Sequence, residues 1–169
     1  MNLESSPFLL TELLRNGAIK LRLTSGKRDG ILDELVAMIP EIQDNPPARS
    51  TLLKALRERE QLHSTGIGDG VAIPHARNAL VGLVQRSVIV FGRHPEGVNY
   101  GAIDGEPTKL FFLIISPTVT QHLAILARLS RLLRNPTLRK NLLAADKPER
   151  VLTLIREAEA NTQLTPSAL

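Results

Sequence analysis

The chain has no cysteine and no tryptophan, and aromatic side chains make up 3% of its 169 residues. Without cysteine it cannot form disulfides or thiolate metal sites, so histidine and the hydroxyl residues are the available nucleophiles. The few aromatic side chains leave little to stack on bases, and no DNA- or RNA-binding motif is present, so we expect no nucleic-acid partner. No apolar run is long enough to cross a bilayer, which predicts a cytoplasmic location without membrane insertion.

Length and composition indicate one compact domain. A hydrophobic content of 43% in 169 residues is enough to bury a sizeable core. We expect this single domain to cover residues 1–160, followed by a frayed polar tail over 161–169. The net charge is +4. The densest basic cluster consists of Arg128, Arg131, Arg134 and Arg139. Such a cluster suits an acidic protein surface or a phosphate group.

Hydrophobic periodicity predicts a mixture of helices and strands. The expected helices cover residues 8–15, 27–39, 46–60, 119–134, 136–145 and 148–160. The expected strands are rich in apolar and β-branched residues and cover 18–23, 71–73, 87–92 and 109–115. The continuous apolar run 110–115 indicates a core strand that is covered on both faces.

The longest expected helix, 119–134, has an apolar face and a basic face. The residues expected to point inward are Leu123, Leu126, Ala127, Ser130 and Leu133. Three arginines, at positions 128, 131 and 134, should lie along another face.

The most informative segment covers residues 64–75 and has the sequence STGIGDGVAIPH. Its three alternating glycines free the backbone either to approach an anion or to turn sharply. A short apolar run follows, and Pro74 then fixes its own φ, so His75 should leave the core at a defined angle. A nucleophile that is presented to a docking partner needs such an arrangement. We therefore predict that His75 is phosphorylated; the alternative is an ordinary surface histidine.

Phosphoryl transfer to His75 would need particular surroundings. A histidine accepts a phosphoryl group only through an unprotonated ring nitrogen, which a free imidazole with a pKa near ~6.5 supplies at neutral pH. Because the transition state spreads charge over the equatorial oxygens, cationic or donating groups must surround it. Arg59 is one candidate, since a guanidinium can hold phosphoryl oxygens in a bidentate way. Alternatively, Arg59 is an exposed helix-end arginine paired with a glutamate.

His122 is the second candidate partner of His75. It lies in the first turn of the longest expected helix, after Thr118 and Thr120, either of which could be the N-cap. A helix N-terminus repels positive charge, so His122 should stay neutral and offer one N–H to an anion. The alternative is an ordinary surface histidine on a helix.

A metal site built from His63, His75 and His122 is the rival chemical hypothesis. The chain has no carboxylate–histidine spacing of the zinc-hydrolase kind, so we expect neither a metal nor a cofactor. His63 precedes the glycine segment and could touch the site, whereas His94 has no comparable setting.

Residues 56–75, LREREQLHSTGIGDGVAIPH, closely resemble the signature of fructose/mannitol-type enzyme IIA domains of the phosphoenolpyruvate-dependent phosphotransferase system. The later segments GAIDGEP (101–107) and QHL (121–123) resemble the same family. The similarity extends over about residues 27–155. It implies an α/β sandwich with a mixed central sheet flanked by helices.

The resemblance also implies roles for single residues. His75 would be the phosphorylated histidine, His122 the second active-site histidine and Arg59 the phosphate-binding arginine. Ala76 departs from the family pattern, in which glycine commonly follows the phosphorylated histidine. Its Cβ could narrow the freedom of the backbone beside the phosphate.

The resemblance implies partners as well. An HPr-like carrier protein would donate the phosphoryl group. As a single domain, the chain is most similar to the nitrogen-related branch, in which the phosphorylation state controls partner proteins such as transporters or kinases. One alternative is a sugar-specific subunit that passes the group to an enzyme IIB of a fructose-like permease. Another is a binding module that docks on a transporter or kinase regardless of phosphate.

Overall fold

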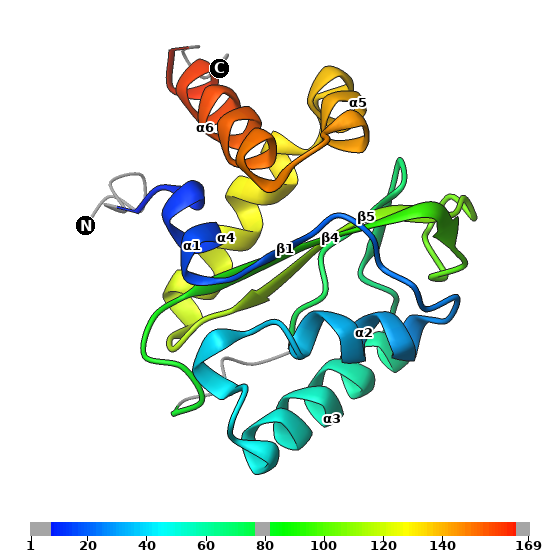
Figure 1. Ribbon diagram of the computed structural model, residues 1–169, viewed down its shortest axis with the longest axis vertical. Helices are drawn as coiled ribbons and strands as arrows, with labels where there is room; N and C mark the ends of the chain where they lie inside the picture. Colours follow the sequence, from blue (N-terminus) through cyan, green and yellow to red (C-terminus); the bar gives the residue numbers. More distant parts are fainter. Residues whose placement is uncertain (1–7, 77–81, 165–169) are drawn as a thin grey trace.

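The computed structural model describes residues 8–76 and 82–164, and it has a five-stranded sheet between two layers of helices (Figure 1). The helices are α1 (Leu10–Asn16), α2 (Arg28–Val36), α3 (Pro46–Leu62), α4 (Val119–Leu132), α5 (Pro136–Ala144) and α6 (Pro148–Leu164), with a short 3-10 helix at Pro40–Ile42. The strands are β1 (Ile19–Lys20), β2 (Gly66–Gly68), β3 (Val71–Ala72), β4 (Val88–Val98) and β5 (Thr108–Ile115). No helix in the described ranges is long and apolar enough to cross a membrane.

The sheet is mixed, with the strand order β1-β4-β5-β3-β2. β1 runs parallel to β4, and β3 runs parallel to β5. The β4–β5 and β2–β3 pairs are antiparallel. Because helices cover both faces of this sheet, the predicted α/β sandwich with a mixed central sheet is confirmed.

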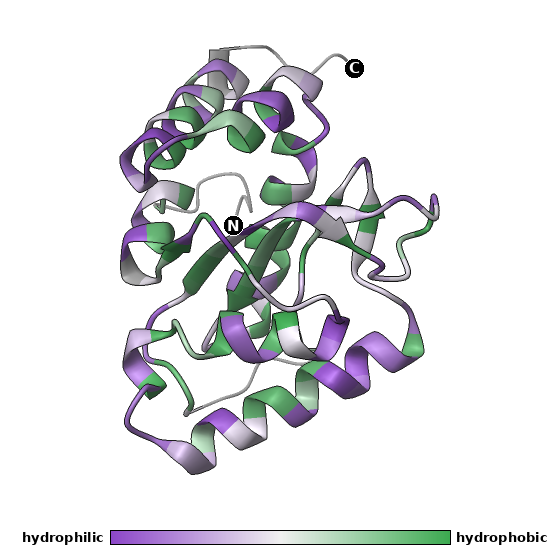
Figure 2. Cartoon of the chain, turned by 45° about the vertical axis from the view of Figure 1, so that its right-hand side comes forward, coloured by the Kyte–Doolittle hydropathy of each residue, from purple (hydrophilic) through white to green (hydrophobic). Residues whose placement is uncertain are grey.

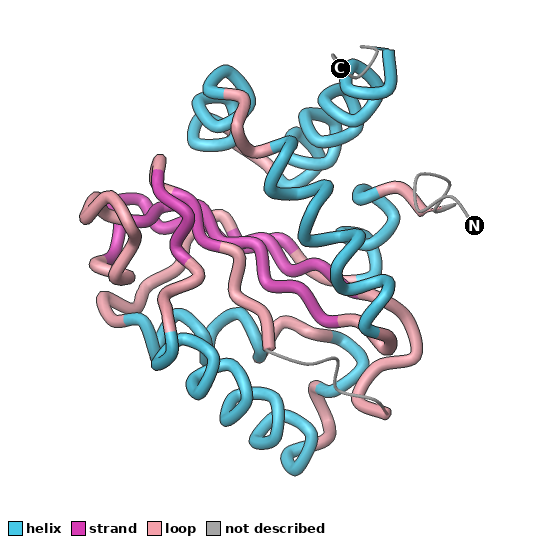
Figure 3. Tube along the Cα trace, turned by 180° about the vertical axis from the view of Figure 1, so that it is seen from behind, coloured by secondary structure: helices cyan, strands magenta, loops and turns pink. Residues whose placement is uncertain are grey.

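Two apolar cores separate the sheet from its helix layers. Successive side chains of a strand point to opposite faces, and β5 follows this rule. Leu110 and Phe112 contribute to the core under α1, α4, α5 and α6, whereas Phe111 and Leu113 contribute to the core over α2 and α3. Figure 2 shows apolar strands in the middle of the molecule, and Figure 3 shows the helix layers on either side. β5 is therefore covered on both faces, as its apolar run predicted.

Several elements end at other residues than expected. The strand expected over 18–23 is reduced to β1, because the pairing with β4 becomes irregular beyond Lys20. The Leu23 amide donates to the Arg93 carbonyl at 2.8 Å, one residue out of the β1–β4 register, and Nε of Arg93 donates to the Leu21 carbonyl at 3.2 Å. β4 continues to Val98, beyond the expected end at residue 92. α6 continues to Leu164, and residues 165–169 of the expected tail lie outside the described residues.

The predicted inward face of α4 is wrong. The helix buries His122, Ile125, Leu129 and Leu132. Of the residues expected to point inward, Leu133 alone is buried, whereas Leu123 is 58% exposed. Two apolar stripes with helical spacing overlap in this sequence, and spacing alone does not choose between them. Packing against β5 selects the stripe that begins at His122.

The observed stripe predicts unequal costs for two leucine truncations in α4. We expect Leu129→Ala to lower the free energy of unfolding by about 2–5 kcal/mol, because Leu129 is fully buried against the sheet. Leu123→Ala should cost no more than about 0.5 kcal/mol, because most of that side chain is in solvent. Urea denaturation of both variants measures the difference, and equal losses would contradict this orientation of α4.

Candidate active site

His75 is placed by the pairing of its segment with β5. Val71 pairs in parallel with Leu110. Further along, an isolated parallel bridge joins His75 to Ile114, whose amide donates to the Pro74 carbonyl at 3.0 Å. The register is the same at both points, so the chain continues beside β5 although proline removes one donor. His75 therefore lies at the carboxyl end of β5.

Alternation of side chains decides which face His75 occupies. Val71 and Ile73 belong to the core under α4, and Ala72 belongs to the opposite core. Because His75 follows Ile73 by two residues in an extended segment, its ring points to the same face. β5 ends one residue after Ile114 and leads directly into α4. The first turn of α4 thus lies over the histidine.

His122 in that first turn lies beside His75. The centroids of the two rings are 5.3 Å apart, with an angle of 51° between the ring planes. His122 is 6% exposed, which rules out the alternative of an ordinary surface histidine. Of the two possible N-caps, Thr118 is the one used: its hydroxyl accepts from the Gln121 amide at 3.2 Å. The structure therefore brings together the two histidines that sequence analysis selected.

A backbone carbonyl determines the tautomer of His75. Its Nδ1 lies 2.7 Å from the Ile73 carbonyl oxygen. A carbonyl oxygen only accepts hydrogen bonds, so Nδ1 must carry the proton. Nε2 then holds the free lone pair of the neutral ring.

Both imidazoles are disfavoured as cations. Burial lowers the pKa of His75 below its ordinary value of 6.5, and the charge of Arg59 lowers it further, whereas the Ile73 hydrogen bond and the Glu60 carboxylate act in the opposite direction. Burial also lowers the pKa of His122, with a second contribution from His75. The direction of this shift agrees with the predicted neutrality of His122, and burial is its largest cause.

Arg59 lies in the last turn of α3 and is half-buried. Its Nη1 donates to the His63 carbonyl at 2.5 Å, which engages one of five guanidinium N–H donors. Its charge is close enough to His75 to lower the pKa of that ring. Among the residues that the structure describes, Arg59 forms no ion pair, so the expected alternative of a glutamate partner is wrong.

The glycine segment forms a tight hairpin. Gly68 of β2 pairs with Val71 of β3, which leaves Asp69 and Gly70 as the loop. Their φ values are 57° and 76°, as a type I′ turn requires, and Gly68 itself has φ of 92°. The Asp69 amide donates to Asp104 Oδ2 at 2.9 Å, which ties the turn to the loop between β4 and β5. Of the two uses that glycine allowed, sharp turning is the one observed.

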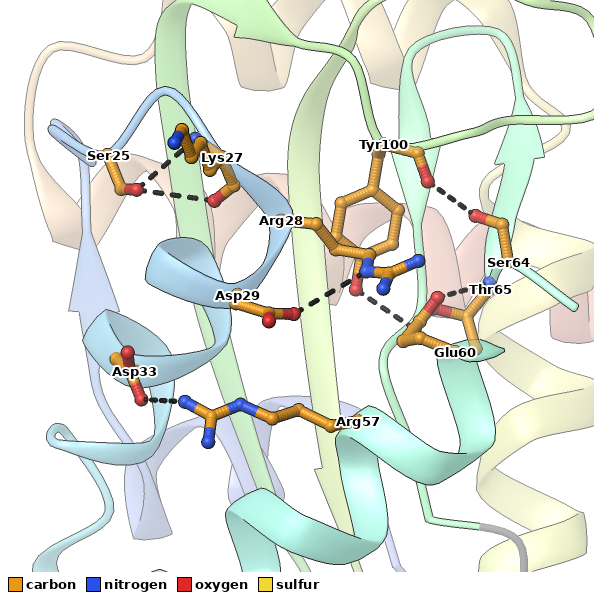
Figure 4. A network of polar contacts seen from close by, with 10 residues as sticks. All are labelled: Ser25, Lys27, Arg28, Asp29, Asp33, Arg57, Glu60, Ser64, Thr65 and Tyr100. Carbon is orange, nitrogen blue, oxygen red and sulfur yellow. Dashed lines mark hydrogen bonds and ion pairs between the residues drawn. The ribbon is translucent and has the colours of Figure 1, made fainter. Parts of the chain in front are cut away.

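Glu60, the neighbour of Arg59, is a buried residue beside the site that was not predicted from the sequence. Its side chain is 3% exposed, and Figure 4 shows its carboxylate between Thr65 and Tyr100. It accepts from the Thr65 amide at 2.9 Å, from the Thr65 hydroxyl, and from the Tyr100 hydroxyl at 2.9 Å. Spacing could have found it, because Glu60 continues the buried stripe of Leu52 and Leu56 at four-residue intervals.

The other two histidines lie in different settings. His63 is exposed at the end of α3. His94 is buried, and its Nδ1 accepts from the amides of Glu96 and Gly97, which shapes a turn within β4. Within 8–76 and 82–164, no three histidine or carboxylate side chains are grouped closely enough to hold a metal ion. Ala76 is buried without a positive φ, so its Cβ brings no left-handed strain.

The sequence of the chain matches that of known proteins. The family model described as "Phosphoenolpyruvate-dependent sugar phosphotransferase system, EIIA 2" matches residues 12–158. The fructose-specific EIIABC component of the phosphotransferase system from Bacillus subtilis is 37% identical over 153 residues; these are 88% of this chain but only 23% of that protein.

Two solved structures complete the comparison. The nitrogen regulatory protein IIA-Ntr from Neisseria meningitidis is 29% identical, with a TM-score of 0.73 over 86% of this chain and 98% of that one. The mannitol enzyme IIA from Escherichia coli, solved in complex with phosphorylated enzyme IIB, shares the fold at 19% identity, with a TM-score of 0.68 over 82% of this chain and 94% of that one. The chain therefore belongs to the type-2 enzyme IIA family of the phosphoenolpyruvate-dependent sugar phosphotransferase system, a family of phosphoryl-transfer proteins.

Proposed function

We propose that the protein accepts a phosphoryl group on Nε2 of His75 from a phosphorylated HPr-like protein, and then passes it on or displays it as a regulatory signal. The orientation of His75 carries this proposal. Nδ1–H is bound to the Ile73 carbonyl, so Nε2 supplies the free lone pair. Burial keeps the ring neutral at physiological pH, as a nucleophile must be.

In the transfer step, the Nε2 lone pair of His75 forms a bond to phosphorus. The bond between phosphorus and the donor atom breaks, and its electron pair stays on the donor. Nδ1 keeps its proton and its hydrogen bond to Ile73, so the ring takes a positive charge next to the phosphoryl dianion. The Ile73 carbonyl and the nearby Glu60 carboxylate favour that charge, as the direction of their effect on the His75 pKa indicates.

His122 and Arg59 would stabilise the phosphoryl oxygens. A neutral His122 beside the His75 ring can donate one N–H to an oxygen. Arg59 can turn its remaining N–H groups to the same oxygens in a bidentate way. The transition state of phosphoryl transfer is served mainly by such positioning and charge.

We place the protein with regulatory carriers. The match to IIA-Ntr of Neisseria meningitidis over almost all of that chain supports this role. The second candidate is a sugar-specific subunit that donates to an enzyme IIB, which the identity to the fructose-specific protein favours. Mixing the phosphorylated protein with a fructose-type enzyme IIB separates the two, because only a sugar-specific subunit should transfer its group rapidly. The cytoplasmic location stays a prediction.

Incubation with phosphoenolpyruvate, enzyme I and HPr tests the phosphoryl acceptor. We expect an acid-labile, alkali-stable adduct in the wild type and in His63→Ala, because the exposed His63 ring takes no part. His75→Ala should form none. Intact-mass spectrometry measures the adduct, and an adduct that survives in His75→Ala would reject the assignment. A wild type that forms no adduct but still binds its partner would favour the binding module.

The pH dependence of phosphorylation should follow the lowered pKa of His75. Only the neutral ring is a nucleophile, so the rate should fall on acidification only below pH 6.5, the ordinary pKa of histidine. The free energy of unfolding should also fall on acidification. The unfolded chain, whose histidine pKa is not lowered, takes up protons first as the pH drops through 6.5. NMR titration of both rings provides the measurement, and midpoints at or above 6.5 would contradict the burial argument.

Replacement of Arg59 by lysine should slow transfer more than it harms folding. A lysine keeps the charge but cannot form the two-pronged contact, so we expect the phosphorylation rate to fall about 10- to 100-fold. Because Arg59 is half-exposed, the free energy of unfolding should change by only about 0.5 kcal/mol. Arg57→Lys is the matched control, since Arg57 lies on the same helix but pairs with Asp33 at 2.9 Å. Equal rates in both variants would remove Arg59 from the site.

A further inference from the structure

Glu60 is a buried carboxylate that the transfer step does not use directly. Its three donors come from two segments: Thr65 opens the hairpin before His75, and Tyr100 lies in the loop after β4 (Figure 4). Burial, and then Glu60 itself, raises the pKa of Tyr100 well above 10.0, so the phenol keeps its proton and remains a donor. A further hydrogen bond joins the same two segments, since the Ser64 hydroxyl donates to the backbone carbonyl of Tyr100 at 2.8 Å.

The contacts of Glu60 continue to His75 in two further steps. The Thr65 carbonyl accepts from the Ile73 amide at 3.1 Å. The Ile73 carbonyl in turn accepts from Nδ1 of His75 at 2.7 Å. Each step is a hydrogen bond or a single residue of chain, and Thr65 is 4% exposed. The residue whose carbonyl selects the His75 tautomer is thus held by Thr65 through its own amide.

We propose that Glu60 is a positioning residue, which acts through Thr65 to fix Ile73, the residue whose carbonyl orients the His75 ring. It acts by accepting from both donors of Thr65, the amide and the hydroxyl, and the Tyr100 hydroxyl holds Glu60 in turn. Without it, the hairpin strand that anchors Ile73 loses its tie to α3. The ring of His75 is then free to exchange between its two tautomers, and Nε2 is no longer the constant nucleophile. The kinetic part of this inference rests on the proposed phosphorylation of His75.

The chain offers a matched control in Glu159. This carboxylate is 5% exposed and also has three donors, which are the amides of Leu10 and Thr11 and the Arg128 guanidinium. It ties α1 and α4 to α6 and makes none of its contacts with the His75 segment. The Glu159→Ala variant therefore also lacks a buried carboxylate, but it keeps the hydrogen bonds that connect Glu60 to His75.

The experiment compares the full chain with Glu60→Ala and Glu159→Ala. We expect both variants to lose thermal stability, because each leaves three donors without an acceptor. Nitrogen-15 NMR of the unphosphorylated protein should show protonated Nδ1 and bare Nε2 for His75 in the wild type and in Glu159→Ala. Glu60→Ala should show a mixture of tautomers and phosphorylation about 10- to 100-fold slower, as a misplaced reacting group causes. Glu60→Gln, which keeps an acceptor for the Thr65 amide, should recover part of both losses.

The outcomes separate positioning from mere stability. A folded Glu60→Ala that keeps the single tautomer and a phosphorylation rate within about twofold of wild type overturns the proposal. The same changes in Glu159→Ala as in Glu60→Ala overturn it too, because they would follow from lost stability. If Glu60→Ala does not fold, Tyr100→Phe replaces it, because this isosteric change removes only one donor to Glu60. A tautomer of His75 and a phosphorylation rate that both stay as in the wild type count against the proposal. If the wild type accepts no phosphoryl group, the proposed function fails, while the tautomer still tests the positioning of the ring.

Discussion

The parallel pairing of residues 71–75 with β5 holds the candidate site together. One constant register carries the chain past Pro74 and leaves His75 opposite Ile114, at the carboxyl end of a strand that is buried on both faces. Strand alternation then points the ring to the side of α4, and the short connection after β5 brings the first turn of α4 to the same place. Two residues far apart in sequence, His75 and His122, meet because one strand pairs with the first and continues into the helix of the second.

This arrangement places two imidazoles side by side where the protein largely shields them from water. At a ring separation of 5.3 Å, two positive charges would repel each other, and burial removes the water that would screen them. The structure resolves this by keeping both rings neutral, with one proton of His75 bound to a carbonyl. The same neutrality is what a phosphoryl acceptor needs, so the requirement of folding and the requirement of chemistry agree here.

Tight turns and buried carboxylates connect this site to the rest of the molecule. The Asp69–Gly70 turn closes the hairpin that ends in the His75 segment. Glu60 on α3 anchors the start of that hairpin, while Glu159 on α6 anchors α1 and α4 within their own helix layer. In both places a carboxylate collects amide and side-chain donors that would otherwise stay unsatisfied in the interior. Buried polar contacts therefore add to the apolar packing on both sides of the sheet.

Much of the site could be predicted from local patterns. The glycine, apolar and proline order of residues 64–75 pointed to His75, and the position of His122 behind possible caps pointed to the start of a helix. The sandwich fold came from the family resemblance, since its mixed strand order has no signal in local periodicity. The extent of β1 was missed because its pairing with β4 becomes irregular after Lys20, where the Leu23 amide meets the Arg93 carbonyl out of register. The inward face of α4 was missed because two stripes fit the same helical period.

By itself, the sequence determined which residues can carry the chemistry: with no cysteine, histidine and the hydroxyl residues are left as nucleophiles, and the order of residues 64–75 points to His75. Spacing along the chain sets where helices, strands and the sharp turn form. Only the tertiary structure decided which nitrogen of His75 is free, that His122 is buried, and that Glu60 faces the interior. Those properties depend on groups distant in sequence, because a tautomer follows from the carbonyl beside the ring and burial follows from the neighbouring layer. Local patterns record neither of these.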